Sequence, residues 1–209
     1  MALRKREPSS RVEDKSERRD QARSLDALTK QLEQGDATVR RWAARDLAVY
    51  PTAAPLLCQH LEHETDLSVR EAMLDSLMQL GNTAVVDGLL PMLRSADVAL
   101  RNEIIELLQN MPAAVAPRMR GLLADQDENI RIYAIDVARA LAHPEVPEMM
   151  RDLLARESHI NVIGQAVECL AEAGTPEVLP VLEELKANHS TEPFIVFAVD
   201  TAISRITGC

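Results

Sequence analysis

The sequence predicts an all-α fold, a right-handed α-solenoid (superhelix) built from about six helix pairs. Apolar residues recur three, four and seven places after the arginine of a repeated motif, which is the spacing of one face of an α-helix. The 209 residues are 46% hydrophobic but only 2% aromatic, and seven are glycine, so little material is left for strands. The motif returns about every 30 residues, which is typical of one small unit repeated along the chain. Its four copies are Asp36-Ala-Thr-Val39-Arg40, Asp66-Leu-Ser-Val69-Arg70, Asp97-Val-Ala-Leu100-Arg101 and Asp127-Glu-Asn-Ile130-Arg131.

The charge is divided unevenly along the chain. Residues 1–24 hold eight Lys or Arg and five Asp or Glu, a net charge of +3, whereas residues 25–209 carry a net charge of −13. The leading segment has almost no apolar residues to bury, which is typical of disorder. We therefore expect a disordered basic tail over residues 1–12 and a single α-solenoid domain over residues 13–209.

The two ends of the predicted array bear on oligomeric state. The stretch from Glu13 to Gln34 carries a narrow leucine stripe and indicates a leading helix that ends before Gly35. This helix either caps the first repeat or pairs with another chain. At the other end, the segment from Phe194 to Ile206 carries apolar residues that could form a dimer contact. We expect a monomer or a weak homodimer.

Each motif opens the second helix of a pair. Its Asp stands at the N-cap, where a carboxylate accepts amide hydrogens of the first turn. The fifth and sixth repeats keep the apolar face but lose the motif, with Ile163 and Ile195 in place of the arginine. Altered terminal repeats are expected where one side of the array has no neighbour. The second helices are predicted near residues 36–50, 66–80, 97–111, 127–141, 160–173 and 192–206.

The first helix of each pair lies between the end of one second helix and the next motif. The ends are marked by residues that stop a helix, such as Pro51, Gly81 and Pro112. Each stretch that follows is short and amphipathic. The first helices are predicted at residues 53–61, 85–93, 115–123 and 146–154.

An Asp-x-x-Val-Arg motif followed by a helix of small residues, repeated near 30 residues, resembles the short HEAT-like repeats of the phycobilisome-lyase type. The resemblance covers roughly residues 25–207. It implies that second helices line the concave side of the solenoid, and that the motif's Asp and Arg form a ladder of contacts between successive repeats. The ladder residues would be Asp36, Arg40, Asp66, Arg70, Asp97, Arg101, Asp127 and Arg131.

Candidate functional residues repeat without packing. With the motif's arginine as reference, the second, fifth, sixth and ninth residues after it fall opposite the apolar face and are predicted to be exposed. The fifth place holds an acid in five consecutive repeats, and the second place holds three of the few aromatic residues. The acids are Asp75, Glu106, Asp136, Glu168 and Asp200, and the aromatic residues are Trp42, Tyr133 and Phe197.

A row of acids beside spaced aromatic rings suits a basic protein segment, because carboxylates pair with Lys or Arg and flat rings anchor a chain. The sequence therefore predicts a non-catalytic interaction scaffold whose acidic concave face binds a basic partner. The alternative is that acids simply occupy the wet face of each helix, and that the aromatic residues tuck against neighbouring repeats. An acidic body argues against nucleic-acid partners.

Catalytic and metal signals are weak, and we expect no cofactor. His60 and His63 are three residues apart on a helix, but a metal site needs further ligands from elsewhere. The chain has no glycine-rich phosphate loop, no Gly-x-Ser-x-Gly motif and no apolar run long enough to span a membrane. The distant cysteines, Cys58, Cys169 and Cys209, are expected to be reduced thiols of a cytoplasmic protein.

The resemblance also implies a second function class. Phycobilin lyases and related chromophore-handling proteins use these repeats, so the chain could be a lyase subunit that acts on a bilin-bearing protein. An acidic groove would suit an acidic tetrapyrrole poorly. A third interpretation is an adaptor in bacterial signalling that docks a regulator, and the residues do not separate it from general scaffolding.

Overall fold

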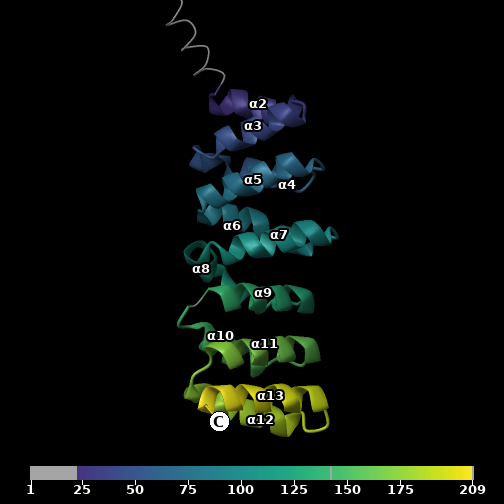
Figure 1. Ribbon diagram of the computed structural model, residues 1–209, viewed down its shortest axis with the longest axis vertical. Coiled ribbons are helices and arrows are strands. Elements are labelled where there is room, and N and C mark those ends of the chain that lie inside the picture. Colours follow the sequence, from purple (N-terminus) through teal and green to yellow (C-terminus); the bar gives the residue numbers. More distant parts are fainter. Residues whose placement is uncertain (1–22, 142, 209) are drawn as a thin grey trace, which may run out of the picture. The chain divides into compact units, whose positions relative to one another are not determined.

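The computed structural model describes residues 23–141 and 143–208, which form 12 α-helices and no strand (Figure 1). This confirms the all-α class. The basic tail over residues 1–12 and the start of the leading helix lie outside the described residues. The chain divides into two compact units, one up to Gly88 and the other from Leu89. The single domain over residues 13–209 stays a prediction.

The first unit contains the opening helix pairs. Helix α3 packs against both α2 and α5, and α4 packs against α5. The 3-10 turn η1 precedes α4, and α6 reaches the boundary between the units. The bounds are α2 (Leu25–Gln34), α3 (Ala37–Leu47), η1 (Pro51–Ala53), α4 (Ala54–Leu61), α5 (Leu67–Leu80) and α6 (Thr83–Leu89).

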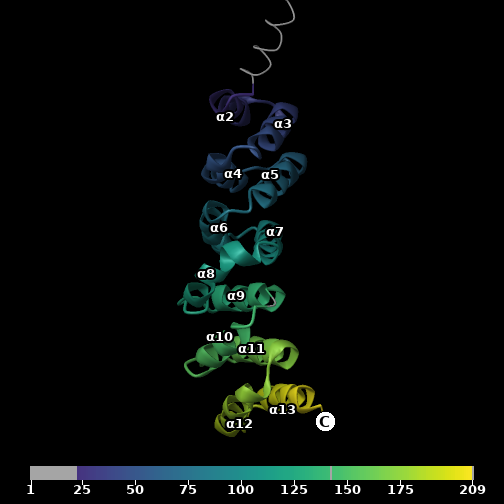
Figure 2. The ribbon, with the colours of Figure 1, turned by 90° about the vertical axis from the view of Figure 1, so that its left-hand side faces the viewer.

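The second unit is layered. Its second helices pack in sequence, α7 against α9, α9 against α11 and α11 against α13, and the first helices form the other layer (Figure 2). The bounds are η2 (Leu90–Arg94), α7 (Val98–Gln109), α8 (Pro112–Leu122), α9 (Glu128–Ala140), α10 (Val146–Leu154), α11 (Ile160–Ala173), η3 (Pro176–Val178), α12 (Leu179–Asn188) and α13 (Pro193–Thr207).

The helices lie close to their predicted positions because the spacing of apolar residues and the capping residues indicate the same helix bounds. Apolar residues three, four and seven places after each reference position are mostly buried, as for Ala134, Ile135 and Ala138 of α9. Helix α5 ends at Gly81, whose φ of 52° is the left-handed conformation that glycine adopts readily. One predicted first helix differs. Pro91 cannot donate a backbone hydrogen bond, and the segment predicted as one helix over 85–93 is α6 followed by the 3-10 turn η2.

Candidate functional site

The motif's aspartates act on their own helices. The Asp97 carboxylate accepts hydrogen bonds from the amides of Ala99 at 2.9 Å and Leu100 at 3.1 Å. The other three aspartates form the same kind of N-cap on α3, α5 and α9. Their side chains therefore satisfy amides that the first turn of each helix leaves unpaired. These four residues are Asp36, Asp66, Asp97 and Asp127.

The motif's arginines fasten the loop that leads into their own helix. Arg70 donates to the Glu64 carbonyl at 3.0 Å, and Arg101 donates to the Ser95 carbonyl at 2.6 Å. Arg40 and Arg131 make the corresponding bonds, to carbonyls five or six residues earlier. The guanidinium thus closes the turn ahead of the N-cap, where backbone carbonyls lack helical partners.

Two arginines also reach the next repeat, through glutamates that lie outside the motif. Arg40 of α3 pairs with both carboxylate oxygens of Glu64, each at 2.9 Å. Arg131 of α9 pairs likewise with Glu157, at 2.6 and 3.1 Å. At two junctions the arginine thus pairs with a glutamate outside the motif, and the Arg40 charge also acts on Asp66, the N-cap of the next repeat. The ladder expected from the resemblance stays a prediction.

The electrostatics of the two glutamates are alike. Burial opposes ionisation of the Glu64 carboxyl, but the Arg40 guanidinium and two backbone amides outweigh it and hold its pKa below the ordinary value. The same balance holds for Glu157, whose carboxylate accepts bonds from Arg131 and from the amides of Ser158 and His159. Both groups are therefore charged at neutral pH and tie two repeats together.

The acidic positions differ in burial and in whether the carboxylate already has an ion-pair partner in the chain. Glu168 is exposed but lies 3.3 Å from the Arg139 guanidinium, and exposed Asp200 pairs with Lys186. Asp136 is half-buried, and burial raises the pKa of its carboxyl, with Arg139 acting in the opposite sense. The carboxylate row of the second unit is therefore largely neutralised from within.

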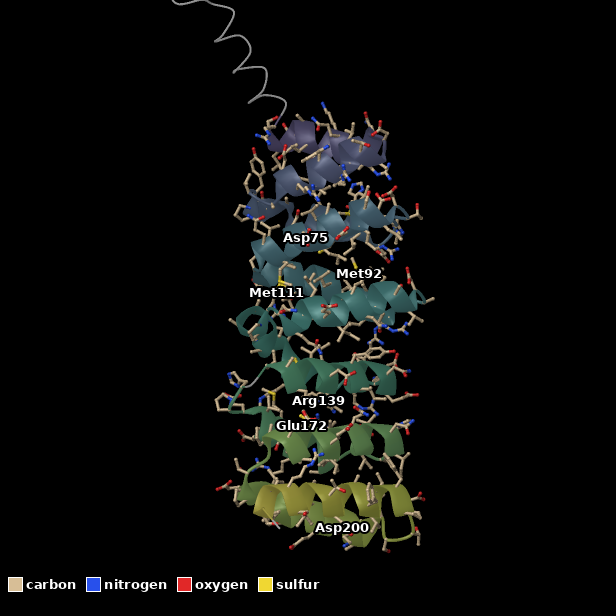
Figure 3. The ribbon with its side chains drawn as sticks, in the orientation of Figure 1. Asp75, Met92, Met111, Arg139, Glu172 and Asp200 are labelled. Atoms are coloured by element: carbon tan, nitrogen blue, oxygen red, sulfur yellow. The ribbon has the colours of Figure 1, made fainter. Side chains whose placement is uncertain are left out.

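Two acidic positions keep an exposed carboxylate without an ion pair among the described residues. Asp75 lies on α5 in the first unit, and Glu106 lies on α7 in the second (Figure 3 labels Asp75). The equivalent position on α3 is Arg45, a cation. Each unit therefore keeps one free carboxylate at this position, and the acidic positions do not form a row of free charges.

The aromatic positions are exposed unequally. Trp42 is 53% exposed, and the guanidinium groups of Arg41 and Arg45 lie 5.7 Å and 5.4 Å from its ring centroid. Tyr133 is half-buried, with the Arg101 guanidinium 5.4 Å from its ring. Phe197 is 72% exposed. Trp42 and Phe197 thus offer open rings, while Tyr133 packs within its unit.

The sixth place after the reference was predicted to be exposed, and this is wrong for the middle repeats. Ser76, Leu107, Val137 and Cys169 stand there and are all buried. The spacing of apolar residues predicts one buried face of a helix. In a middle repeat, the second helix of the pair has a neighbouring second helix on either side, so its two sides are buried as well. Only Asp46 and Thr201, in the terminal repeats, are partly exposed at this place.

The eighth residue after each reference position also carries contacts, which the predicted pattern of exposed places does not include. Arg139 stands there on α9 and contacts Glu168 and Glu172 of α11, the latter at 3.7 Å (Figure 3). Gln109 stands there on α7 and donates to the Asp136 carbonyl of α9 at 3.0 Å. A long polar side chain at one register in consecutive repeats is the signal that points to these contacts.

The described cysteines are not poised for nucleophilic chemistry. Burial raises the pKa of the Cys58 thiol to about 12 and that of Cys169 to about 11, so both stay protonated at neutral pH. Cys209 lies outside the described residues. Within residues 23–141 and 143–208, no group of three or more His, Cys, Asp or Glu side chains could hold a metal ion. His60 and His63 are therefore not part of such a group. In the same ranges no helix is long and apolar enough to cross a membrane.

Comparison with known proteins gives consistent matches. A family model for HEAT repeats matches residues 25–109 and 115–193. The bilin biosynthesis protein PecE of Nostoc sp. (strain PCC 7120) is 31% identical over 199 residues, which cover 82% of this chain and 78% of that protein. The crystal structure of an engineered protein matches at 20% identity and a TM-score of 0.41, covering 87% of this chain and 95% of that one. A second engineered protein matches at 20% identity and a TM-score of 0.40, covering 88% and 59%.

Proposed function

Because this chain belongs to the family of HEAT-repeat proteins, whose helix pairs generally mediate protein binding, we propose that it is a protein-binding subunit that handles a bilin. In this role it holds a bilin-bearing protein, as a lyase-type subunit would. The observation that carries the proposal is the 31% identity to a bilin biosynthesis protein, spread over most of both chains.

The structure removes one objection to this role. An uninterrupted acidic face would repel a bilin, an open-chain tetrapyrrole with propionate carboxylates. In the second unit Arg139 and Lys186 neutralise two of the acidic positions, and in the first unit the Arg41 and Arg45 guanidinium groups lie 5.7 Å and 5.4 Å from the Trp42 ring centroid. Neither surface repels a flat anionic chromophore, because the acids are paired on one and the charges beside the exposed ring are positive on the other.

The buried thiols define what this chain contributes. Covalent attachment of a bilin through a thioether needs a reactive thiolate, and Cys58 and Cys169 remain protonated in the core. Neither of these two described cysteines fits the acceptor, and we propose that the acceptor cysteine belongs to the partner protein. In this proposal the chain holds that protein and its chromophore.

Absorption spectroscopy tests the proposal directly. The purified chain is titrated with biliverdin, and then with a bilin-bearing phycobiliprotein whose spectrum reports chromophore geometry. We expect a saturable spectral change in each case, since a chromophore that leaves water for a protein surface changes conformation. Each ligand in buffer without protein, and each ligand with an unrelated helical-repeat protein, serve as controls. Spectra that stay additive at every ratio, for both ligands, would contradict bilin handling.

A second candidate is the adaptor that binds a basic protein segment. The net charge of −13 over residues 25–209 and the two exposed, unpaired carboxylates of Asp75 and Glu106 favour it. The variant D75K/E106K should keep its helicity, because both side chains are exposed, and should lose a basic partner from a native lysate. Asp136 is left unchanged because it is half-buried, and a loss of binding in a variant at this position could result from misfolding.

The control for this second test reverses acids elsewhere. E183K/E184K changes the net charge equally on α12, a first helix, where both acids are exposed and make no ion pair among the described residues. Capture should survive in that variant and fall with rising salt in the wild type, as expected of an electrostatic contact. Equal capture by wild type and D75K/E106K would rule out the adaptor reading of these positions.

A further inference from the structure

Side chains at the eighth place after the reference bridge neighbouring second helices in the second unit. Gln109 of α7 bonds to the backbone of α9 at 3.0 Å, and Arg139 of α9 bonds to Gln165 at 3.4 Å and Glu168 at 3.3 Å, both on α11. These bridging side chains lie across the line where two helices meet. They occupy space that would otherwise be open to solvent.

The bridge is missing between α11 and α13. Ala171 stands at the eighth place of α11, and Gly164 stands at the first place, where α9 has Ile132. Because α11 and α13 lie side by side (Figures 1 and 2), Ala171 leaves a gap where Arg139 of the preceding second helix carries a long side chain, whereas the Phe194 ring covers Gly164. A groove of about 320 Å³ lies there, and Ala198 of α13 also lines it.

Two phenyl rings border this groove. Phe194 is 60% exposed and Phe197 is 72% exposed, whereas Ile130 and Val162, at the register of Phe194 in earlier repeats, are 3% and 0% exposed. The Phe194 ring lies directly over Gly164, since a Cβ there would be 2.6 Å from Cε1 of the ring. The site therefore has flat walls and a floor of small side chains, which suits a flat ligand.

The charge that remains available at the groove is positive. Glu168 lines it but pairs with Arg139, while the exposed Arg205 guanidinium makes no ion pair within the described residues. A volume of about 320 Å³ falls at the lower end of small-molecule sites, which span roughly 300–1,000 Å³. Such a groove accommodates part of a conjugated ligand, with Arg205 placed to pair with an attached carboxylate.

We propose that the α11–α13 groove binds a flat, conjugated ligand that carries a carboxylate, and that this ligand is one end of a bilin. The second half of this statement rests on the function proposed above. The first half stands on the groove alone, namely the missing bridge, the two open phenyl rings and the unpaired guanidinium.

Two probes separate the two halves. The fluorescence of 1-pyrenebutyrate, a flat carboxylate unrelated to bilins, reports occupancy of the groove, and the absorption of biliverdin reports the bilin. The decisive variant is A171R, which restores the arginine that α9 carries at the same register and so fills the groove. F197A removes an exposed ring at little risk to folding, and R205Q removes the cation without changing the fold of α13.

We expect F197A to weaken both probes about tenfold or more, because it removes one wall of the groove. A171R should weaken the uncharged 1-pyrenebutanol to the same extent, because the new side chain fills the groove and its charge has no carboxylate to pair with. R205Q should weaken 1-pyrenebutyrate but leave the uncharged 1-pyrenebutanol unchanged. The matched controls are L67A, an exposed apolar residue of α5, and R151Q, an exposed arginine of α10, and both should bind as wild type. Circular dichroism and the unfolding midpoint verify the fold, and F197A carries the test if A171R unfolds.

Failure of the groove and failure of the function give different results. If A171R and F197A bind biliverdin as tightly as wild type, the groove is not the site, although bilin handling stands. If wild type binds 1-pyrenebutyrate through the groove but never biliverdin, the groove stands and the proposed function fails. If wild type binds neither probe, the proposal is overturned. Light scattering that shows F197A or A171R converting a dimer to a monomer would then identify a second copy as the occupant of the groove.

Discussion

At the scale of single residues, Glu64 and Glu157 have a role that their surroundings create. Each lies two residues before the N-cap position of a second helix, at Asp66 or His159, and accepts bonds from an arginine of the preceding repeat and from two amides of its own loop. A carboxylate held by several donors at once is expected to stabilise the fold more than an exposed ion pair. The junction therefore depends on a residue outside the repeated motif.

The variant E64Q tests this role. We expect it to lower the free energy of unfolding by about 2 kcal/mol at pH 7, because it breaks a largely buried, charge-assisted pair with Arg40. E62Q, on an exposed neighbour, should change little. Urea denaturation followed by circular dichroism measures both. Similar values for the two variants would show that Glu64 is not a junction residue.

The pH dependence of the same variant has a fixed sign. The pKa of Glu64 and that of Glu157 lie below the ordinary glutamate value in the folded chain, so their contribution is complete above about pH 4.3 and is lost as the pH falls through the folded pKa. The unfolding free energies of wild type and E64Q should therefore converge below about pH 4. A constant difference from pH 7 to pH 3 would contradict this assignment.

At the scale of the helix, the motif is chiefly a start signal. Asp66 caps α5 through the amides of Ser68 and Val69, whereas His159 and Glu192 begin α11 and α13 without a side-chain cap. The later helices depend instead on burial, as shown by Val162, Ile163 and Val167, which are fully buried. Helices of one array thus form for different reasons.

This difference predicts unequal costs for cap removal. D66A should lower the unfolding midpoint by a few degrees, since it leaves amides of the first turn of α5 unpaired. H159A should cost less than about 0.5 kcal/mol, because no cap bond is lost. Thermal unfolding of both variants beside wild type provides the measurement. A larger loss in H159A than in D66A would refute the assignment of caps.

The helices could be predicted from the sequence because caps and apolar spacing are local. The second helix expected over 160–173 coincides with α11, and α10 coincides with the first helix expected over 146–154. Burial of Leu107 and Val137 could not be predicted from the same pattern, because it depends on a neighbouring helix. The exposed rings of Trp42 and Phe197 were predicted as candidates, but the groove beside Phe197 depends on small residues of α11, which belong to another repeat.

At the scale of the whole chain, charge is the dominant feature. The formal net charge is −10 at pH 7, so like charges repel in the folded state, while the partly buried pairs of Arg40 and Arg131 are shielded from salt. Repulsion among exposed charges should therefore respond to salt more than these pairs do. We expect the folded state to gain stability as salt rises.

Calorimetry tests the balance. Raising NaCl from about 0.01 M to about 0.2 M shortens the Debye length from about 30 Å to less than 10 Å, and the unfolding midpoint at pH 7 should rise by a few degrees. The same change at pH 5, near the sequence pI of about 5.0, should have a smaller effect. A midpoint that falls with salt at pH 7 would mean that attraction between exposed charges outweighs repulsion.

The bridging side chains have a consequence for how such a chain can evolve. In the second unit, the residue at the eighth place after each reference position decides whether the contact line between two neighbouring second helices is covered or open. This residue is Gln109 on α7, Arg139 on α9 and Ala171 on α11. Each of these residues is supplied by one helix alone. A single codon change from a long to a short side chain can therefore open a recess in one repeat and leave the recesses of the others as they were, so that new surface chemistry arises without redesign of the scaffold.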